Sequence, residues 1–358
     1  MPTTTLEQRV NGLTNIRMME PIPMTTPREL KDKYPITKEV ALTVLKTRRH
    51  IKSILNKKDS RFIIITGPCS IHDYNSAIEY AKKLKTLSEQ VEDKILLVMR
   101  AYLEKPRTGY DWEGLIPDPD INGTYDINKG YDTTRKLLLE INNMGVPIAT
   151  EIVDERYTPQ YIDDLTSWVA IGARTVESQD HRKAVSGYSM PVGFKNNTAG
   201  DIKTAVDAVK KSRYPYKFPG VDLNLKGAIF PTTGNPETHI ILRGGNGTPN
   251  YDEKSVKQAE QLLEEAKLPP RIMIDCSHAN SGKDYNRQPD VFKNIIHQHQ
   301  TNKNIFGLML ESHLKEGKQS FTYLQDSPSS LDPNQSMTDS CVGWGVTEEL
   351  VRWSYERL

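Results

Sequence analysis

Short apolar runs alternate with amphipathic stretches along the chain from residue 61 onward. Continuous apolar runs bounded by turn residues predict strands that are buried on both faces, and the amphipathic stretches predict helices that cover them. This alternation is typical of parallel βαβ units. There are eight such runs, the strand number of a (β/α)₈ barrel. The predicted strands are Phe62–Thr66, Ile95–Ala101, Pro147–Val153, Val169–Val176, Pro191–Lys195, His239–Arg243, Arg271–Asp275 and Ile305–Glu311.

One segment does not fit the alternation. Residues 214–238 contain four prolines among apolar pairs, Pro215, Pro219, Pro231 and Pro236. Proline interrupts helices and central strands, so an amphipathic helix is excluded here. We expect an inserted β-hairpin ahead of the sixth barrel strand, with a regulatory or oligomeric role rather than a catalytic one.

Residues 1–58 precede the first barrel strand. A segment rich in proline and methionine at 18–27 is followed by a helix that begins near Thr37. Its apolar residues with helical spacing are Val40, Val44, Leu45, Ile51, Ile54 and Leu55. We expect the arm to pack on a neighbouring subunit. The predicted organisation is therefore an N-terminal arm and helix in residues 1–58, for oligomer formation or regulation, and a catalytic barrel in residues 59–358.

Composition narrows the class of protein. The 358 residues carry 47 Lys+Arg and 46 Asp+Glu, a net charge of +1, which argues against a nucleic-acid or anionic-membrane partner. The three cysteines, Cys69, Cys276 and Cys341, are too few and too scattered for a disulfide framework. The N-terminus lacks the apolar region of a secretory signal, and no apolar run approaches a membrane span. We expect a soluble protein of the reducing cytoplasm.

Basic residues follow several of the predicted strands. Barrel enzymes carry their catalytic groups at the carboxyl-terminal ends of the strands, so these cations are expected to converge on one face. Each of them alone is better explained as a solvated surface residue. Six together predict a ligand with several negative charges, and guanidinium groups suit carboxylate and phosphate. The six are Arg100, Lys105, Arg107, Arg174, Lys195 and Arg243.

A second set of residues offers metal ligands. Cys69, His278, Glu311 and Asp339 supply a thiolate, an imidazole and two carboxylates. This mixture suits Mn²⁺, Fe²⁺, Co²⁺ or Zn²⁺ better than Mg²⁺ or Ca²⁺. The spacing is wide, and other roles stay open: Cys69 as a small buried apolar residue, His278 as a hydrogen-bonded loop histidine and Asp339 as a helix N-cap.

Seven motifs resemble, in order and register, those of the type I 3-deoxy-D-arabino-heptulosonate 7-phosphate (DAHP) synthases, and the likeness runs from about residue 60 to Trp344. Lys-Pro-Arg-Thr at 105–108 is the most specific, because it distinguishes enzymes that use erythrose 4-phosphate from octulosonate phosphate synthases. The motifs are GPCSIHD at 67–73, the run from Arg100 to Thr108, AIGART at 170–175, PVGFK at 191–195, HIILRGG at 239–245, Asp275 with 277–280, and ESHL at 311–314.

The resemblance implies a (β/α)₈ barrel that condenses phosphoenolpyruvate with erythrose 4-phosphate at the start of aromatic biosynthesis, with one divalent metal ion. It assigns phosphoenolpyruvate to Arg100, Lys105, Arg174, Lys195 and Arg243, with the backbone of Gly172 and Ala173 beside its phosphate. Erythrose 4-phosphate is assigned to Lys105, Pro106, Arg107 and Thr108. The implied metal ligands are Cys69, His278, Glu311 and Asp339, and Asp339 also faces the substrates.

The implied mechanism adds two roles. Lys105 is the candidate acid near the aldehyde, beside the metal ligands Cys69 and His278. Glu151, at the end of the third predicted strand, is expected to orient Lys195 or the attacking water.

The insertion departs from the family pattern, because it reads VDLNLKG at 221–227. Feedback control by an aromatic amino acid and the identity of its effector therefore stay open. Gln160 and Ser189 are candidates for an effector pocket or for ordinary surface roles. We expect a homo-oligomer, either a dimer or a tetramer. Two other functions remain, an octulosonate-type synthase and a catalytically silent effector-binding paralogue.

Overall fold

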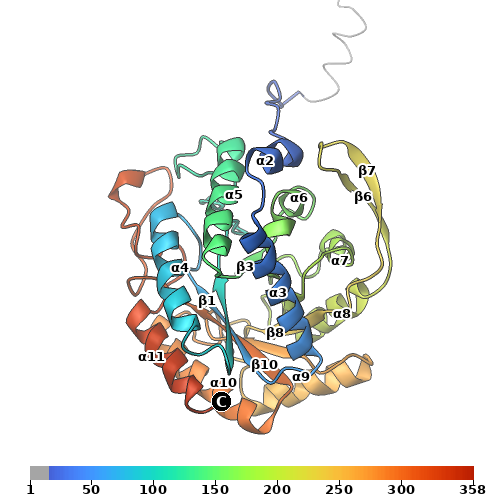
Figure 1. Cartoon of the computed structure of the whole chain (residues 1–358), viewed down its shortest axis with the longest axis vertical. Coiled ribbons are helices and arrows are strands. Elements are labelled where there is room, and N and C mark those ends of the chain that lie inside the picture. The colour runs from blue at the N-terminus through green and yellow to red at the C-terminus, as the bar shows by residue number, and fades with distance from the viewer. Residues whose placement is uncertain (1–15) are drawn as a thin grey trace, which may run out of the picture.

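Eight parallel strands form a closed barrel in the computed structural model, which describes residues 16–358 (Figure 1). Their order around the barrel is β1-β10-β9-β8-β5-β4-β3-β2. The predicted barrel is confirmed. The strands are β1 (Phe62–Gly67), β2 (Ile95–Arg100), β3 (Ile148–Glu151), β4 (Trp168–Ile171), β5 (Val192–Lys195), β8 (Thr238–Leu242), β9 (Ile272–Asp275) and β10 (Ile305–Glu311).

Helices surround the barrel and alternate with its strands (Figure 1). Several begin after an aspartate that accepts a backbone N–H of the first turn, as Asp73 does for α4 and Asp252 for α9. The helices are α2 (Pro27–Lys33), α3 (Lys38–Leu55), α4 (Tyr74–Ser88), α5 (Ile127–Asn143), α6 (Thr158–Ile162), α7 (Gln179–Val185), α8 (Ile202–Ser212), α9 (Glu253–Glu265), α10 (Gln288–Thr301) and α11 (Trp344–Tyr355). No helix within residues 16–358 is both long and apolar enough to cross a membrane.

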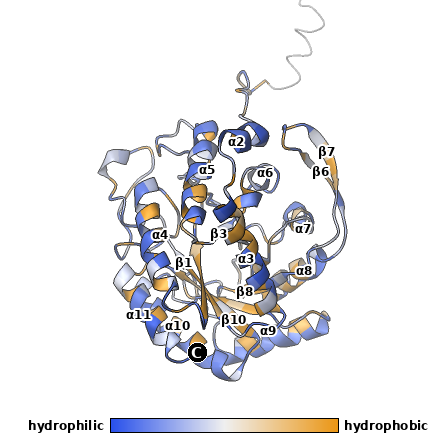
Figure 2. Ribbon diagram, viewed as in Figure 1, coloured by the Kyte–Doolittle hydropathy of each residue, from blue (hydrophilic) through white to orange (hydrophobic). Residues whose placement is uncertain are grey.

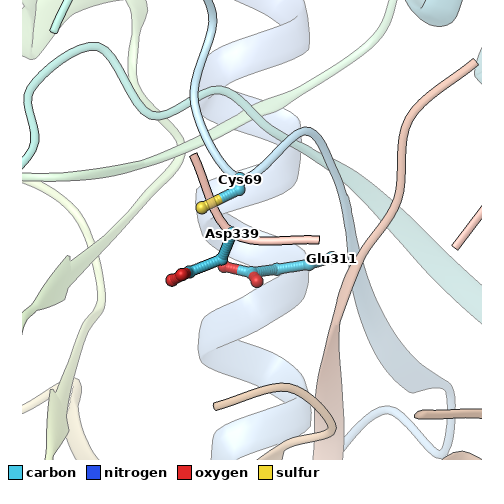
Figure 3. Close-up of side chains that lie close together, drawn as sticks. All are labelled: Cys69, Glu311 and Asp339. Atoms are coloured by element: carbon cyan, nitrogen blue, oxygen red, sulfur yellow. The ribbon is translucent and has the colours of Figure 1, made fainter. Parts of the chain in front are cut away.

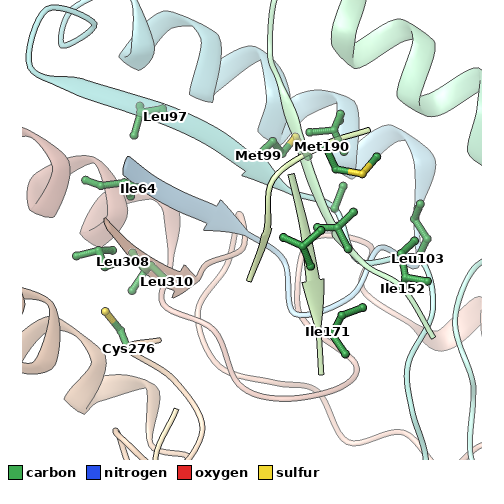
Figure 4. Close-up of a cluster of buried hydrophobic side chains, with 14 of the residues drawn as sticks. Ile64, Leu97, Met99, Leu103, Ile152, Ile171, Met190, Cys276, Leu308 and Leu310 are labelled. Atoms are coloured by element: carbon green, nitrogen blue, oxygen red, sulfur yellow. The ribbon is translucent and has the colours of Figure 1, made fainter. Parts of the chain in front are cut away.

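The barrel strands are apolar on both faces and separate two cores (Figure 2). In β1, Phe62 and Ile64 belong to the core between strands and helices, whereas Ile63 and Ile65 belong to the barrel interior. Figure 4 shows part of the outer core, including Ile64. Because successive side chains of a strand point to opposite faces, burial on both sides requires an unbroken apolar run.

Helix α3 contributes to the barrel interior. Ile51, Ile54 and Leu55 pack in the same core as the inward-facing strand residues. Arg271, just before β9, donates hydrogen bonds to the carbonyl of Leu55 and the side chain of Asn56 at distances of 2.9 and 2.8 Å. Helix α3 therefore closes the end of the barrel opposite the carboxyl ends of the strands.

The insertion forms the predicted hairpin. Strands β6 (Lys217–Val221) and β7 (Gly227–Pro231) pair antiparallel, with Phe218 opposite Phe230. The tip of the hairpin meets the start of α2, where the Arg28 amide donates to the Leu223 carbonyl at 2.9 Å. The hairpin is thus attached to the N-terminal segment of its own chain.

The predicted fourth strand is wrong in its second half. Strand β4 ends at Ile171, and the carbonyl of Gly172 accepts the amides of Thr175 and Val176 in a turn. Arg174 therefore lies in that turn and not on the strand. The turn hydrogen bonds replace the sheet ladder, a choice that apolar periodicity does not reveal.

The packing of the arm on a neighbouring subunit stays a prediction. Its described residues Ile16, Met18, Met19 and Ile22 are exposed in the single chain. Residues 1–15, which belong to the same predicted arm, lie outside the described residues.

Candidate active site

A cavity of about 560 Å³ opens at the carboxyl-terminal ends of the barrel strands. All six cations of the sequence prediction line it, so residues from four different strand ends share one volume. Among its lining residues are Arg100, Lys105, Pro106, Arg107, Glu151, Ala173, Arg174, Lys195, Arg243, His278 and Asp339. Four predicted residues, Thr108, Gly172, Cys69 and Glu311, are not among the residues that line the cavity.

Arg100 forms the floor of the cavity and is fully buried. Its guanidinium donates to the carbonyls of Pro68 and Cys69, each at 3.1 Å, and to Glu311 at 2.8 Å. It also stacks 3.5 Å from the ring centroid of Tyr102. Burial lowers the pKa of Arg100, but Tyr102 and Glu311 outweigh it and raise the pKa above the ordinary value. Arg100 is therefore a fixed positive charge.

Three potential metal ligands meet next to this floor (Figure 3). The ligand atoms of Cys69, Glu311 and Asp339 all lie within 4.8 Å of one another. The register of the barrel explains the first two, because Gly67 at the end of β1 pairs with Glu311 at the end of β10. Asp339 arrives on the loop before α11, which is held by a 2.8 Å hydrogen bond between Thr338 and Ser70.

His278 turns toward the same group. Its backbone is in the left-handed region, with φ of +57°, which is uncommon for a residue with a side chain. Its Nδ1 lies 2.8 Å from the Ser277 hydroxyl and 2.9 Å from Asp275, and its Nε2 faces Glu311 at 3.9 Å. A hydrogen-bonded Nδ1 leaves Nε2 free, which is the arrangement found in histidine metal ligands. The structure thus groups three of the four nominated residues, Cys69, Glu311 and Asp339, and places His278 beside this group through Glu311.

Lys105 lies against the thiol. Its ammonium is 3.2 Å from the sulfur of Cys69 and 3.0 Å from the Cys69 carbonyl. Burial and the Glu311 carboxylate raise the pKa of the Cys69 thiol, and Lys105 lowers it in part. The thiol of the metal-free site therefore holds its proton, and binding of a cation would release it.

A second group of charged side chains, around Lys195, lines the same cavity. Lys195 is nearly buried, with its ammonium 3.3 Å from Asp275 and 3.7 Å from Glu151. Burial would raise the pKa of Asp275, but His278 and Lys195 hold it well below its ordinary value. A Cβ added at Gly172 would lie 2.3 Å from Glu151 Oε1, so a glycine is needed for this carboxylate to keep its place.

The outer part of the cavity carries the Lys-Pro-Arg-Thr segment. Arg107 donates from Nε to the Trp112 carbonyl at 2.8 Å and pairs with Asp111 at 3.2 Å. The Nε of Arg174 lies 3.3 Å from the Thr108 hydroxyl. These contacts hold Arg107 and Arg174 at the mouth of the cavity, more exposed than Arg100.

The sequence prediction missed four residues. Thr198, Asn246 and Lys283 line the cavity, and Asp275 positions both Lys195 and His278. Asp275 ends a predicted strand, so its place at a strand terminus was a usable signal. Thr198, Asn246 and Lys283 lie in loops, where no periodic pattern indicates direction.

A separate cavity of about 570 Å³ lies between the hairpin and helices α6 and α7. Gln160 and Ser189, both named from the sequence, line it, and the hairpin contributes Phe218 and Phe230. Glu155 and Arg156 add charges of both signs. The Ser189 hydroxyl donates to Asp163 at 2.9 Å.

Known proteins resemble this chain over most of its length. It is 44% identical to the Tyr-sensitive phospho-2-dehydro-3-deoxyheptonate aldolase of Escherichia coli (strain K12), covering 97% of both chains. It is 47% identical to the Trp-sensitive enzyme of the same organism, covering 92% of this chain and 93% of that one.

A solved structure agrees with this result. A phospho-2-dehydro-3-deoxyheptonate aldolase from Francisella tularensis SCHU S4 superimposes with a TM-score of 0.91 at 43% sequence identity, covering 95% of this chain and 98% of the other. The family model described as the DAHP synthetase I family matches residues 33–352. The chain therefore belongs to the DAHP synthetase I family.

Proposed function

We propose that this chain is a metal-dependent DAHP synthase, which condenses phosphoenolpyruvate with erythrose 4-phosphate and water to give DAHP and inorganic phosphate. The observation that carries the proposal is the convergence of six cations on one cavity beside Cys69, His278, Glu311 and Asp339. Family membership supports the same reaction.

Charge balance supports two phosphorylated substrates. Each phosphate carries about −1.5 to −2 at neutral pH, so with one carboxylate the two substrates total roughly −4 to −5. The six cations and a divalent ion, offset by one thiolate and the carboxylates of Glu311 and Asp339, come to about +5, and the carboxylates of Glu151 and Asp275 beside Lys195 lower this to about +3. The charges of a filled site would thus largely cancel, which favours binding of both substrates together.

The cations divide between the two substrates. Arg100, Lys105, Arg174, Lys195 and Arg243 hold phosphoenolpyruvate, with the backbone of Gly172 and Ala173 near its phosphate. Lys105, Pro106, Arg107 and Thr108 hold erythrose 4-phosphate, whose phosphate lies at the outer end with Arg107 and Thr108. Asp339 faces both the metal and the substrates.

Cys69, His278, Glu311 and Asp339 hold the metal, which is Mn²⁺, Fe²⁺, Co²⁺ or Zn²⁺ by the softness of the thiolate. The donor set fits such an ion, because three ligand atoms already lie within 4.8 Å of one another and the free Nε2 of His278 faces them. A divalent ion bound there supplies a Lewis acid for the aldehyde oxygen of erythrose 4-phosphate.

The chemistry of the side chains follows from their places. As C3 of phosphoenolpyruvate bonds to the aldehyde carbon, Lys105 donates a proton to the aldehyde oxygen. Water then adds to C2, and one of its protons returns to Lys105. The resulting hemiketal phosphate collapses to the ketone and expels inorganic phosphate, which takes the second proton. Glu151 holds the Lys195 ammonium and orients it or the attacking water.

The second cavity binds an aromatic amino acid as a feedback effector. Phe218 and Phe230 offer an apolar wall, and Glu155 and Arg156 offer partners for an ammonium and a carboxylate. The names of the relatives, Tyr-sensitive and Trp-sensitive, support an effector of this class. The exposed apolar residues of the arm support a homo-oligomer, a dimer or tetramer, which light scattering would measure.

The test is consumption of phosphoenolpyruvate by the purified protein in the cytoplasmic range of pH. Turnover is expected with erythrose 4-phosphate and not with arabinose 5-phosphate, which an octulosonate-type synthase would prefer. EDTA should abolish turnover, and one of Phe, Tyr and Trp should reduce it. Absence of any turnover with the metal restored would instead favour a silent paralogue.

A further inference from the structure

Two loops at the barrel mouth meet at one buried carboxylate. Asp118 lies in the loop after β2 and is fully buried. The hydroxyl of Tyr323, in the loop after β10, donates a hydrogen bond of 2.9 Å to Asp118 Oδ2 across 205 residues of sequence. Tyr323 itself is 9% exposed, so the bond is shielded from water.

Asp118 organises the loop in which it lies. Its carboxylate accepts the backbone N–H groups of Gly123 and Tyr125 at 3.0 and 3.4 Å. Its carbonyl accepts the indole N–H of the buried Trp112 at 2.8 Å. A buried carboxylate is stabilised by such donors, and removal of one donor leaves its negative charge less well compensated.

The same loop sets the place of Arg107. The Trp112 carbonyl accepts Arg107 Nε at 2.8 Å, and the Lys105 amide donates to the Glu113 carbonyl at 2.7 Å. Three hydrogen bonds, joined through the covalent structure of Asp118 and Trp112, therefore link Tyr323 to the guanidinium at the cavity mouth.

The second loop also borders the metal-ligand group. It extends from Glu311 to Asp339, and Tyr323 lies between them. Its neighbour Leu324 packs against the first loop so closely that a Cβ added at Gly123 would lie 2.8 Å from Leu324 Cδ2. The two loops are thus in direct contact, and the Tyr323 hydroxyl adds a hydrogen bond between them.

We propose that Tyr323 is a positioning residue for the sugar-phosphate substrate, acting through Asp118 and Trp112 on Arg107. This inference rests on the proposed function, since it takes Arg107 as a partner of the erythrose 4-phosphate phosphate. Loss of the hydroxyl loosens the loop that fixes Arg107, whereas Arg100, Lys195 and Arg243 stay in place and the Lys105 ammonium keeps its bond to the Cys69 carbonyl. Binding of the sugar phosphate weakens, whereas binding of phosphoenolpyruvate does not.

The variant Tyr323→Phe removes only the hydroxyl. A hydrogen bond to a buried charged group contributes enough to shift an equilibrium by about tenfold, so we expect the KM for erythrose 4-phosphate to rise by up to about tenfold. The KM for phosphoenolpyruvate and kcat should stay within about twofold, the pattern of lost ground-state binding. The matched control is Tyr110→Phe, whose exposed ring lies 5.9 Å from that of Tyr323 and makes no bond to Asp118.

Coupling to Arg107 is tested by a double-mutant cycle. In an Arg107→Ala background, Tyr323→Phe should add no further increase in the KM for erythrose 4-phosphate. An additive increase, or an equal change in both KM values, would overturn the proposal.

Hydrogen exchange measures the loop without any substrate. The amide of Gly123, which donates to the same Asp118 oxygen as Tyr323, should exchange faster in Tyr323→Phe than in the wild type, and Tyr110→Phe should match the wild type at this amide. Unchanged exchange in Tyr323→Phe would refute the structural link. Failure of the proposed function is seen separately, as a wild-type protein that does not consume erythrose 4-phosphate.

Discussion

At the scale of single residues, the candidate metal ligands are held in place by a few specific polar contacts. Cys69, Glu311 and His278 each belong to a different strand end, and each has one or two polar contacts that fix its direction. Their types were readable from the sequence, since thiol, imidazole and carboxylate are the usual ligands of borderline metals. Their directions were not.

Cys69→Ala removes the thiolate ligand and should abolish turnover, with a loss greater than the roughly 100-fold effect typical of residues behind a metal ligand. Metal content after dialysis, measured by elemental analysis, should fall in parallel, while the melting temperature of the metal-free protein changes little. Cys276→Ala is the matched control, because Cys276 is an equally buried thiol whose side chain packs in the outer core. Full metal content in Cys69→Ala would contradict the ligand assignment.

Gly172→Ala tests the place of Glu151. The new Cβ would lie 2.3 Å from Glu151 Oε1, so the flexible carboxylate must move away from Lys195. We expect kcat to fall on the order of tenfold to a hundredfold, as for a small misplacement of a catalytic group. Stability should change little, because only the end of a side chain shifts. Gly345→Ala, with no atom within 4 Å of its Cβ, is the control, and equal activity of the two variants would remove Glu151 from the mechanism.

At the scale of elements, helix α3 is the informative case. Its start after Thr37 follows from capping and is confirmed. Of the six apolar positions predicted from periodicity, five are buried, whereas the prediction for Leu45 is wrong because its side chain is exposed. Periodicity cannot say what an apolar face covers. The same stripe would suit a neighbouring subunit or, as found for Ile51 and Ile54, the open end of the barrel of its own chain.

Ile54→Ala should destabilise the protein by about 2–4 kcal/mol, because it leaves a cavity in the barrel interior. Leu45→Ala, on the exposed side of the same helix, should cost about 0.5 kcal/mol or less. Urea unfolding of both variants measures the difference. Equal stabilities would mean that α3 does not close the barrel in solution.

At the scale of the whole molecule, buried neutral histidines link stability to pH. Burial, with Arg271 nearby, lowers the pKa of His239 to about 3, and burial lowers that of His299 to about 4. His239 Nε2 accepts the indole N–H of Trp168, and His299 Nδ1 lies 2.6 Å from the Ile305 carbonyl. Each imidazole ordinarily titrates near pH 6.5.

The direction of this pH dependence follows from the difference in proton binding between the folded and the unfolded chain. Below pH 6.5 these two histidines bind protons in the unfolded chain but stay neutral in the folded chain. The free energy of unfolding that is present at neutral pH is therefore lost as the pH falls toward 4. Each histidine should contribute a slope on the order of 1.4 kcal/mol per pH unit. Urea unfolding in EDTA at a series of pH values measures it, and His239→Gln should reduce the slope. A stability that is flat from pH 7 to 5 in the wild type would contradict this account.

The sequence by itself determined the barrel, the hairpin and the kinds of chemistry at the site. Burial on both faces leaves an apolar run in each strand, and a substrate of several negative charges leaves basic residues after the runs, so both signals are local. Only the tertiary structure decided which residues meet: the approach of Cys69 to Asp339, the turn after Gly172, the place of α3 and the bond from Tyr323 to Asp118. Those contacts depend on strand register and barrel closure, which join segments far apart and leave no periodic trace in either one.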